Sequence, residues 1–201
     1  MKVLQVNKYH YVRAGAERVF FNTMELLSSH GHEVIPFCTR YHKNLPSEYD
    51  KYFADAPEIR EQSFGGKIKA IPRFFRNSDA ARKLDKLLTD TKPDIAHLHN
   101  IFNGLSMSIL PVFAKHGVPV VMTIHDSRLV CPTANWMLKG KHCHNCRNSL
   151  YTNCLFHQCY DNNLTISLFS MLEMIHKDFL FNYDKYISKY IFLNHEYISQ
   201  M

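Results

Sequence analysis

The chain has 201 residues, of which 46% are hydrophobic, and a formal net charge of +6. This length is enough to bury a core and indicates one domain. No apolar run reaches the roughly 18 residues of a membrane-spanning helix, and the segment 1–7 is too short and too polar for a signal peptide. We therefore expect a cytoplasmic protein.

Strand patterns alternate with helical patterns along the chain. Short buried strands are predicted at 3–6, 34–38, 94–99, 118–124 and 190–193. Apolar residues at helical spacing occur in four places: Val19, Phe20, Met24 and Leu27; Ala81, Leu84, Leu87 and Leu88; 105–116; and Leu168, Leu172, Ile175 and Phe179. This order predicts an α/β fold with a Rossmann-like, doubly wound parallel sheet and helices on both faces.

Three residues mark expected boundaries of the helices. Gly31 and Gly117 follow helical patterns and can take the left-handed conformation that ends a helix. Pro111 lies inside the pattern at 105–116, so we expect a kink or a break in that helix.

A His-Asp pair follows the fourth predicted strand. His125 and Asp126 come directly after the apolar run 118–124. Ligands of open α/β sheets bind outside the carboxyl ends of the strands, so these side chains could meet a polar ligand. The alternative is a capping Asp126 and a solvated His125, and the junction by itself favours neither.

The turn after the first predicted strand contains small residues. Ala14, Gly15 and Ala16 come just before the first helical pattern, where backbone N–H groups and the helix N-terminus favour an anion. The turn lacks the G-x-G-x-x-G pattern of dinucleotide-binding folds. A tight turn without a ligand and a binding loop are equally compatible with this spacing.

Cysteines gather in one segment, about 131–160, that we expect to be a loop excursion. Cys143 and Cys146 have the C-x-x-C spacing of a zinc knuckle, and Cys131, Cys154 and Cys159 lie nearby. In a reducing compartment a disulfide framework is not expected. One possibility is that the cysteines bind zinc, which would stabilise a segment poor in apolar residues. The alternative is that the thiols are reduced and bind no metal.

Basic residues gather between Lys67 and Lys86. The segment has seven Lys and Arg residues against two Asp, with Ile68, Phe74 and other apolar residues among them. Such a pattern is compatible with an anionic membrane surface or with nucleic acid. The alternative is a solvated face of a loop and a helix.

Six short motifs of this chain resemble motifs of glycosyltransferase family 4, both in their residues and in their order along the chain. They are 14–19 (AGAERV), 29–34 (SHGHEV), 93–99 (PDIAHLH), 117–121 (GVPVV), 123–126 (TIHD) and 129–132 (LVCP). One departure is Ala14, because the family usually has glycine there. The resemblance covers essentially the whole chain.

The resemblance implies the acceptor-side half of a GT-B fold over residues 1–201. In this family two Rossmann-like halves enclose the active site, and the C-terminal half binds most of the nucleotide-sugar donor. We therefore expect that this chain lacks the donor half and is inactive alone, as a truncated product, an excised domain or one subunit of a split enzyme. The implied reaction is retaining transfer of a sugar to a glycan or lipid-linked acceptor in cell-surface polysaccharide synthesis.

The resemblance also assigns roles to particular residues. His125 matches the histidine that reaches the transferred sugar or the acceptor, and is the implied catalytic residue. Gly15 and Ala16, together with Ala14 and Glu17, are the implied substrate-binding turn. Asp126 is expected to orient His125 or the acceptor. His99 is expected at the same edge of the sheet as a further substrate-binding residue. The alternative is that His99 has only a structural role.

Cofactors and partners follow from the same resemblance. A subset of the family has cysteines matching Cys131, Cys143, Cys146 and Cys159, which we expect to bind one structural zinc, with Cys154, His142, His144 or His157 as substitutes. No catalytic metal is expected. The implied partners are the acceptor, the donor half in cis or in trans, and an anionic cytosolic membrane face contacted through Lys67–Lys86.

Two other functions remain open from the sequence. One is a non-catalytic subunit that supplies acceptor specificity to a separate donor half. The other is a zinc-stabilised nucleic-acid-binding module, which is disfavoured because no nucleic-acid-binding motif is present.

Overall fold

A computed structural model describes residues 1–56, 75–102, 104–146 and 149–193. The chain forms two compact units. The first comprises Met1–Thr123 and Asp184–Ile191, and the second comprises Ile124–Tyr183 and the chain from Phe192 onward. The predicted excursion at 131–160 lies inside the second unit.

A five-stranded sheet is the centre of the first unit. Its order is β2-β1-β3-β4-β7, with β1 (Lys2–Val6), β2 (Glu33–Phe37), β3 (Ile95–Leu98), β4 (Val120–Ile124) and β7 (Lys189–Phe192). The pairs β1–β2, β1–β3 and β3–β4 are parallel. All five predicted strands are therefore confirmed.

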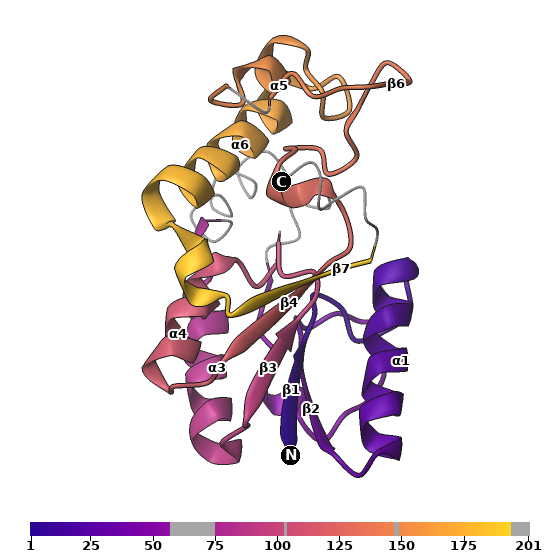
Figure 1. The fold of residues 1–201 in the computed structure, drawn as a ribbon, viewed down its shortest axis with the longest axis vertical. Coiled ribbons are helices and arrows are strands. Elements are labelled where there is room, and N and C mark those ends of the chain that lie inside the picture. Colours follow the sequence, from indigo (N-terminus) through magenta and orange to yellow (C-terminus); the bar gives the residue numbers. More distant parts are fainter. Residues whose placement is uncertain (57–74, 103, 147–148, 194–201) are drawn as a thin grey trace. The chain divides into compact units, whose positions relative to one another are not determined.

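Helices cover both faces of this sheet, as predicted. Figure 1 shows α1 (Gly15–Ser29) on one side and α3 (Ser78–Thr91) and α4 (Leu110–Lys115) on the other. The strands between them read as apolar runs because they are buried from both sides. Leu4, Ile35 and Leu98 have no exposed surface.

The expected helix boundaries are largely correct. Gly31 and Gly117 have positive φ of 76° and 66° after α1 and α4, a conformation that glycine adopts without a Cβ clash. The pattern at 105–116, in which a kink or a break was expected, is divided into a 3-10 turn, η3 (Met107–Ile109), and α4. Pro111 lies in the first turn of α4, where its missing N–H costs no helical hydrogen bond.

Asn77 is a buried junction of the first unit, with 1% of its surface exposed. Its Oδ1 accepts from the Ala80 N–H at 3.0 Å and caps α3. Its Nδ2 donates to the carbonyls of Asp55 at 2.9 Å and Gly104 at 2.8 Å. One side chain thus ties α3 to two loops.

The second unit has short elements and one longer helix. These are η4 (Ser127–Leu129), the hairpin β5 (Met137–Leu138) and β6 (Lys141–His142), α5 (Thr152–Phe156), α6 (Leu164–Ile175) and the π-helix η5 (His176–Phe181). The remaining 3-10 turns are η1 (Asp50–Tyr52) in the first unit and η6 (Tyr183–Tyr186) before β7. Among the described residues, no helix is long and apolar enough to cross a membrane.

The buried face of α6 differs from the apolar pattern in the sequence. Ser167, Ser170, Met171 and Met174 are buried, whereas Leu168 and Leu172 are 36% and 38% exposed. Phe179, which the periodicity placed on the same helical face, lies in the π-helix η5 and is 63% exposed. Helical spacing located the helix and not its orientation.

We predict that Asn77→Ala lowers the free energy of unfolding by about 3 kcal/mol. The variant loses a helix cap, worth about 1 kcal/mol, and leaves two carbonyls without their donor, each costing about 1 kcal/mol or more. Urea unfolding followed by circular dichroism measures this change.

Asn163→Ala is the matched control. Asn163 caps α6 by accepting from the Ile166 N–H at 3.1 Å, but it is exposed. Its loss should cost only about 1 kcal/mol. Equal effects of the two substitutions would contradict the role of Asn77 as a buried junction.

Candidate functional site

Hydrogen bonds join the two loops that follow β1 and β2. The Lys8 carbonyl accepts from the backbone N–H of Thr39 at 2.9 Å and from its hydroxyl at 2.6 Å. His10 N–H donates to Asn44 Oδ1 at 3.0 Å, and Leu45 N–H donates to the His10 carbonyl at 2.8 Å. Because β1 and β2 are parallel, both loops lie at the carboxyl edge of the sheet.

These loops bring Tyr9, Tyr11 and Tyr41 together, and we call these three residues the tyrosine cluster. Their ring centroids lie 5.0 to 5.4 Å apart, and Tyr11 and Tyr41 are stacked at an interplanar angle of 16°. All three are half-buried. Burial is the main cause of the raised pKa of Tyr11, so the Tyr11 phenol is uncharged at neutral pH.

Two cations accompany the tyrosine cluster. The Lys8 ammonium lies 5.0 Å and the Arg13 guanidinium 5.4 Å from the centroid of the Tyr9 ring, within the range of cation–π attraction. No sequence motif predicted this arrangement. Its signal was the aromatic content of the two loops, Tyr9 to Tyr11 after the first strand and Tyr41-His42 after the second.

The predicted turn at 14–17 begins α1 and is next in the chain to the tyrosine cluster. Ala14, Gly15 and Ala16 are partly or fully exposed, and no atom would lie within 4 Å of a Cβ added at Gly15. Glu17 is buried, and its Oε2 accepts from the Ala14 N–H at 2.9 Å. Glu17 thus fixes the backbone at the start of the helix.

His99 has no exposed surface. Its Nε2 and the Gln5 Oε1 are 3.0 Å apart. Its ring packs edge-on against the ring of Phe20, with the two ring centroids 5.4 Å apart. The geometry supports the structural role that the sequence left open for this histidine.

His125 and Asp126 begin the second unit. The Asp126 side chain accepts from the Arg128 N–H at 2.9 Å and so caps η4, which agrees with the capping alternative. Burial raises the pKa of Asp126, although this hydrogen bond and the Arg128 charge oppose the shift. Burial lowers the pKa of His125 to about 4, so its imidazole is neutral at pH 7.

Buried charges hold the residues that follow this junction. Arg128 forms an ion pair with Glu173 of α6 and donates to the Pro132 carbonyl. Lys177 pairs with Asp178 and donates to the Leu129 carbonyl at 2.8 Å. The sequence did not predict this network, because Arg128 and Glu173 are 45 positions apart and Lys177 and Leu129 are 48 positions apart.

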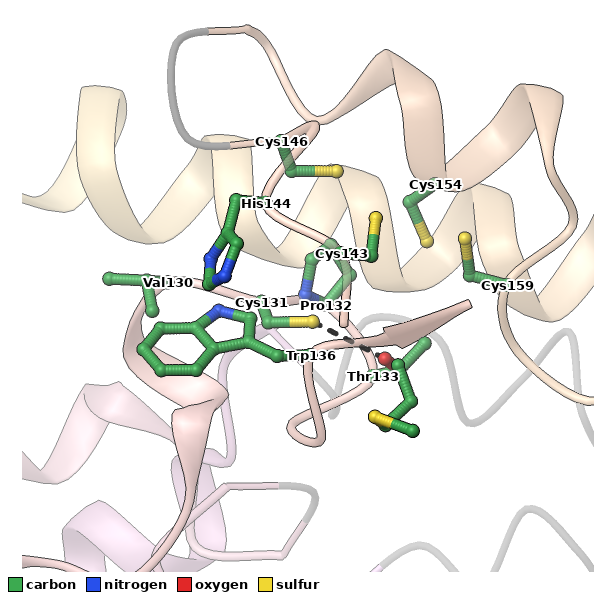
Figure 2. Close-up of a pocket in the computed structure, with 11 residues that line it drawn as sticks. Val130, Cys131, Pro132, Thr133, Trp136, Cys143, His144, Cys146, Cys154 and Cys159 are labelled. Atoms are coloured by element: carbon green, nitrogen blue, oxygen red, sulfur yellow. Dashed lines mark hydrogen bonds between the residues drawn. The ribbon is translucent and has the colours of Figure 1, made fainter. Parts of the chain in front are cut away.

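The five cysteines of the second unit line one cavity of about 30 Å³. Figure 2 shows their side chains around it, together with His144 and Trp136. Burial raises the pKa of Cys146 to about 11 and that of Cys154 to about 12. Among the described residues, no three potential ligands are positioned to hold a metal ion as they stand.

The basic segment is described only from Phe75 onward, so Lys67, Lys69 and Arg73 lie outside the described residues. The three basic residues of α3 have acidic partners: Arg82 and Lys83 contact Asp79, and Lys86 contacts Asp90. Over the whole of α3 these three basic residues are balanced by Asp79, Asp85 and Asp90, so the helix has no net charge, and Arg76 precedes it.

Comparison with known protein families agrees with the resemblance seen in the motifs. A parallel sheet with helices on both faces and polar groups at its carboxyl edge defines a Rossmann-like α/β protein. The family model described as Glycosyltransferase Family 4 matches residues 13–167. No curated protein matches the chain. The chain belongs to glycosyltransferase family 4, and its sheet is that of the N-terminal half of a GT-B fold.

We predict that the His125 imidazole titrates with a pKa of about 4. Nuclear magnetic resonance between pH 3.5 and pH 8 measures it, with His125→Asn to assign the signal. Because the unfolded chain takes up this proton near pH 6.5 and the folded chain does not, the histidine lowers stability as pH falls from about 6.5 to 4. His125→Asn should lose less stability than the native chain over that range.

A His125 pKa near 6.5 would contradict this description of a desolvated imidazole. So would an identical pH dependence of the melting temperature in the native chain and in His125→Asn.

Proposed function

We propose that this chain binds the acceptor for a retaining glycosyltransferase that moves a sugar from a nucleotide sugar to a glycan or lipid-linked acceptor. Cell-surface polysaccharide synthesis is the process that such an acceptor would serve. The observation that carries the proposal is the tyrosine cluster, held at the carboxyl edge of the sheet next to the turn that begins α1.

The chemistry of the tyrosine cluster suits a sugar. Aromatic rings have a negative face, and one face of a pyranose presents slightly positive C–H groups. The phenol oxygens, the Lys8 ammonium and the Arg13 guanidinium can hydrogen-bond to the hydroxyl groups at the edge of the sugar. Apolar surface with a few placed polar groups is the usual composition of a small-molecule site.

The start of α1 suits an anionic group. The first N–H groups of a helix have no partner within it, and the helix dipole favours negative charge there. Glu17 holds the Ala14 N–H, which leaves Gly15 and Ala16 to present theirs. Without a side chain, Gly15 lets a phosphate of the donor or of a lipid-linked acceptor approach the backbone.

His125 would serve as a neutral hydrogen-bonding group. With a pKa of about 4, its imidazole can both donate and accept a hydrogen bond at pH 7, and it can contact a sugar hydroxyl in the oxocarbenium-like transition state. Asp126 caps η4 and so fixes the backbone next to His125. The positive groups that stabilise the leaving diphosphate would come from the donor half, in cis or in trans.

We predict that Tyr11→Ala and Tyr41→Ala each weaken oligosaccharide binding about tenfold. Loss of one aromatic contact costs on the order of 1 to 1.5 kcal/mol, which is close to a factor of ten in Kd. Saturation-transfer NMR with a panel of neutral oligosaccharides identifies a ligand, and titration then gives its Kd.

The control is Tyr186→Ala. Tyr186 is also half-buried and has the Lys185 ammonium 4.9 Å from its ring centroid, but it belongs to neither loop. Its loss should leave sugar binding unchanged. No binding of any glycan by the native chain, together with salt-sensitive binding of RNA or DNA, would instead support the nucleic-acid-binding alternative.

A further inference from the structure

The cysteine cavity of the second unit brings together side chains from separate elements. Cys131 follows η4, Cys143 and Cys146 follow β6, and Cys154 and Cys159 lie in and after α5. Figure 2 shows the sulfur atoms of Cys143, Cys146, Cys154 and Cys159 turned toward a common space. Sequence spacing alone could pair only Cys143 with Cys146.

The size of the cavity limits what it can hold. Its volume of about 30 Å³ exceeds the roughly 10 to 15 Å³ that a cavity needs to hold one water molecule. A sugar or a nucleotide is many times larger, whereas a single ion fits. Apart from the thiols, Thr133 and His144, the lining is apolar, with Val130, Pro132, Trp136 and Met137.

The segment around the cavity has little else to stabilise it. Its strands β5 and β6 have two residues each, and α5 has five. Between 131 and 159, Pro132, Tyr151 and Cys154 are the buried residues in the described part. This is too little apolar burial to order such a segment.

The backbone of the same segment is also strained. Five residues other than glycine have positive φ between 47° and 66°, a conformation that disfavours a Cβ: Ala134, Trp136, Lys139, Tyr151 and Gln158. Strain of this kind persists only where other interactions hold the chain in place. The five thiols that line the cavity are placed to supply such interactions if they share a ligand.

We propose that the cavity binds one structural Zn²⁺ through four cysteine thiolates, with Cys143 and Cys146 as the indispensable pair. Cys131 and Cys159 complete the preferred set, and Cys154 is the fifth thiol at the same cavity. Tetrahedral Zn²⁺ prefers thiolate ligands, and structural zinc sites commonly include a C-x-x-C pair. The ion draws the thiols inward, and each ligand releases its proton to solvent.

This site is separate from the proposed sugar-binding site. Its ligands all belong to the second unit, and the tyrosine cluster belongs to the first. Metal binding can therefore be tested without any sugar, and failure of either proposal leaves the other standing.

The test is the metal content of the whole chain, purified without chelators. We expect close to one zinc per chain, and after exchange with Co²⁺ the intense visible absorption of tetrahedral cobalt thiolate. The double variant Cys143→Ala/Cys146→Ala should lose both signals. Cys38→Ala should keep both, because Cys38 is buried in the first unit and does not line the cavity.

A second readout covers the case in which the double variant does not fold. Removing the metal from the native chain with a strong chelator should make the segment 131–159 at least tenfold more sensitive to protease, and added Zn²⁺ should reverse this. Native protein that contains no metal, binds no Co²⁺ and keeps free thiols would overturn the proposal. A disulfide between Cys154 and Cys159 in that protein, seen as a loss of two mass units, would overturn it as well.

Discussion

The hydrogen bonds that join the loops after β1 and β2 are the constraint on which the candidate sugar site depends. The Lys8 carbonyl accepts from both the amide and the hydroxyl of Thr39, and the pairing of His10 with Leu45 continues the connection. Parallel strands bring both loops to one edge of the sheet, and these hydrogen bonds fix the distance between the loops. The tyrosine cluster forms because Tyr9 and Tyr11 come from one loop and Tyr41 from the other. The same backbone leads directly into the turn at Ala14 that begins α1.

The second unit is held in a different way. Its buried apolar group is small, with Tyr151, Met171 and Met174 at its centre, and buried ion pairs involving Arg128 and Lys177 connect the segment after His125 to α6 and η5. Such pairs require good geometry because desolvation of the charges is costly. Burial also acts at the start of this segment, where it lowers the pKa of His125 and raises that of Asp126. Zinc in the cysteine cavity would supply the remaining order.

The sequence predicted the sheet because its strands are apolar runs such as 118–124, and it predicted helices because apolar residues recur at helical spacing and Gly31 and Gly117 mark two helix ends. It could not predict which side of α6 is buried, since that face includes Ser167 and Ser170 and depends on the partners of the helix. The role of Glu17 as a helix cap, the burial of His99 and the capping by Asp126 all depend on contacts that spacing does not encode. The tyrosine cluster needed the register of β1 and β2, which brings together residues about 30 positions apart. Motif order identified the family, and the chemistry of each site residue required the structure.

The central claim is that the carboxyl edge of the first unit receives a sugar acceptor. The most direct measurement is a titration of the isotope-labelled chain with an oligosaccharide that binds to it. The backbone amide signals of the chain are followed by NMR. We expect chemical-shift changes concentrated at the amides of residues 9–16 and around Tyr41. We also expect contacts between sugar C–H protons and the rings of Tyr11 and Tyr41. Shifts confined to the second unit, with the signals of residues 9–16 unchanged at saturation, would contradict it.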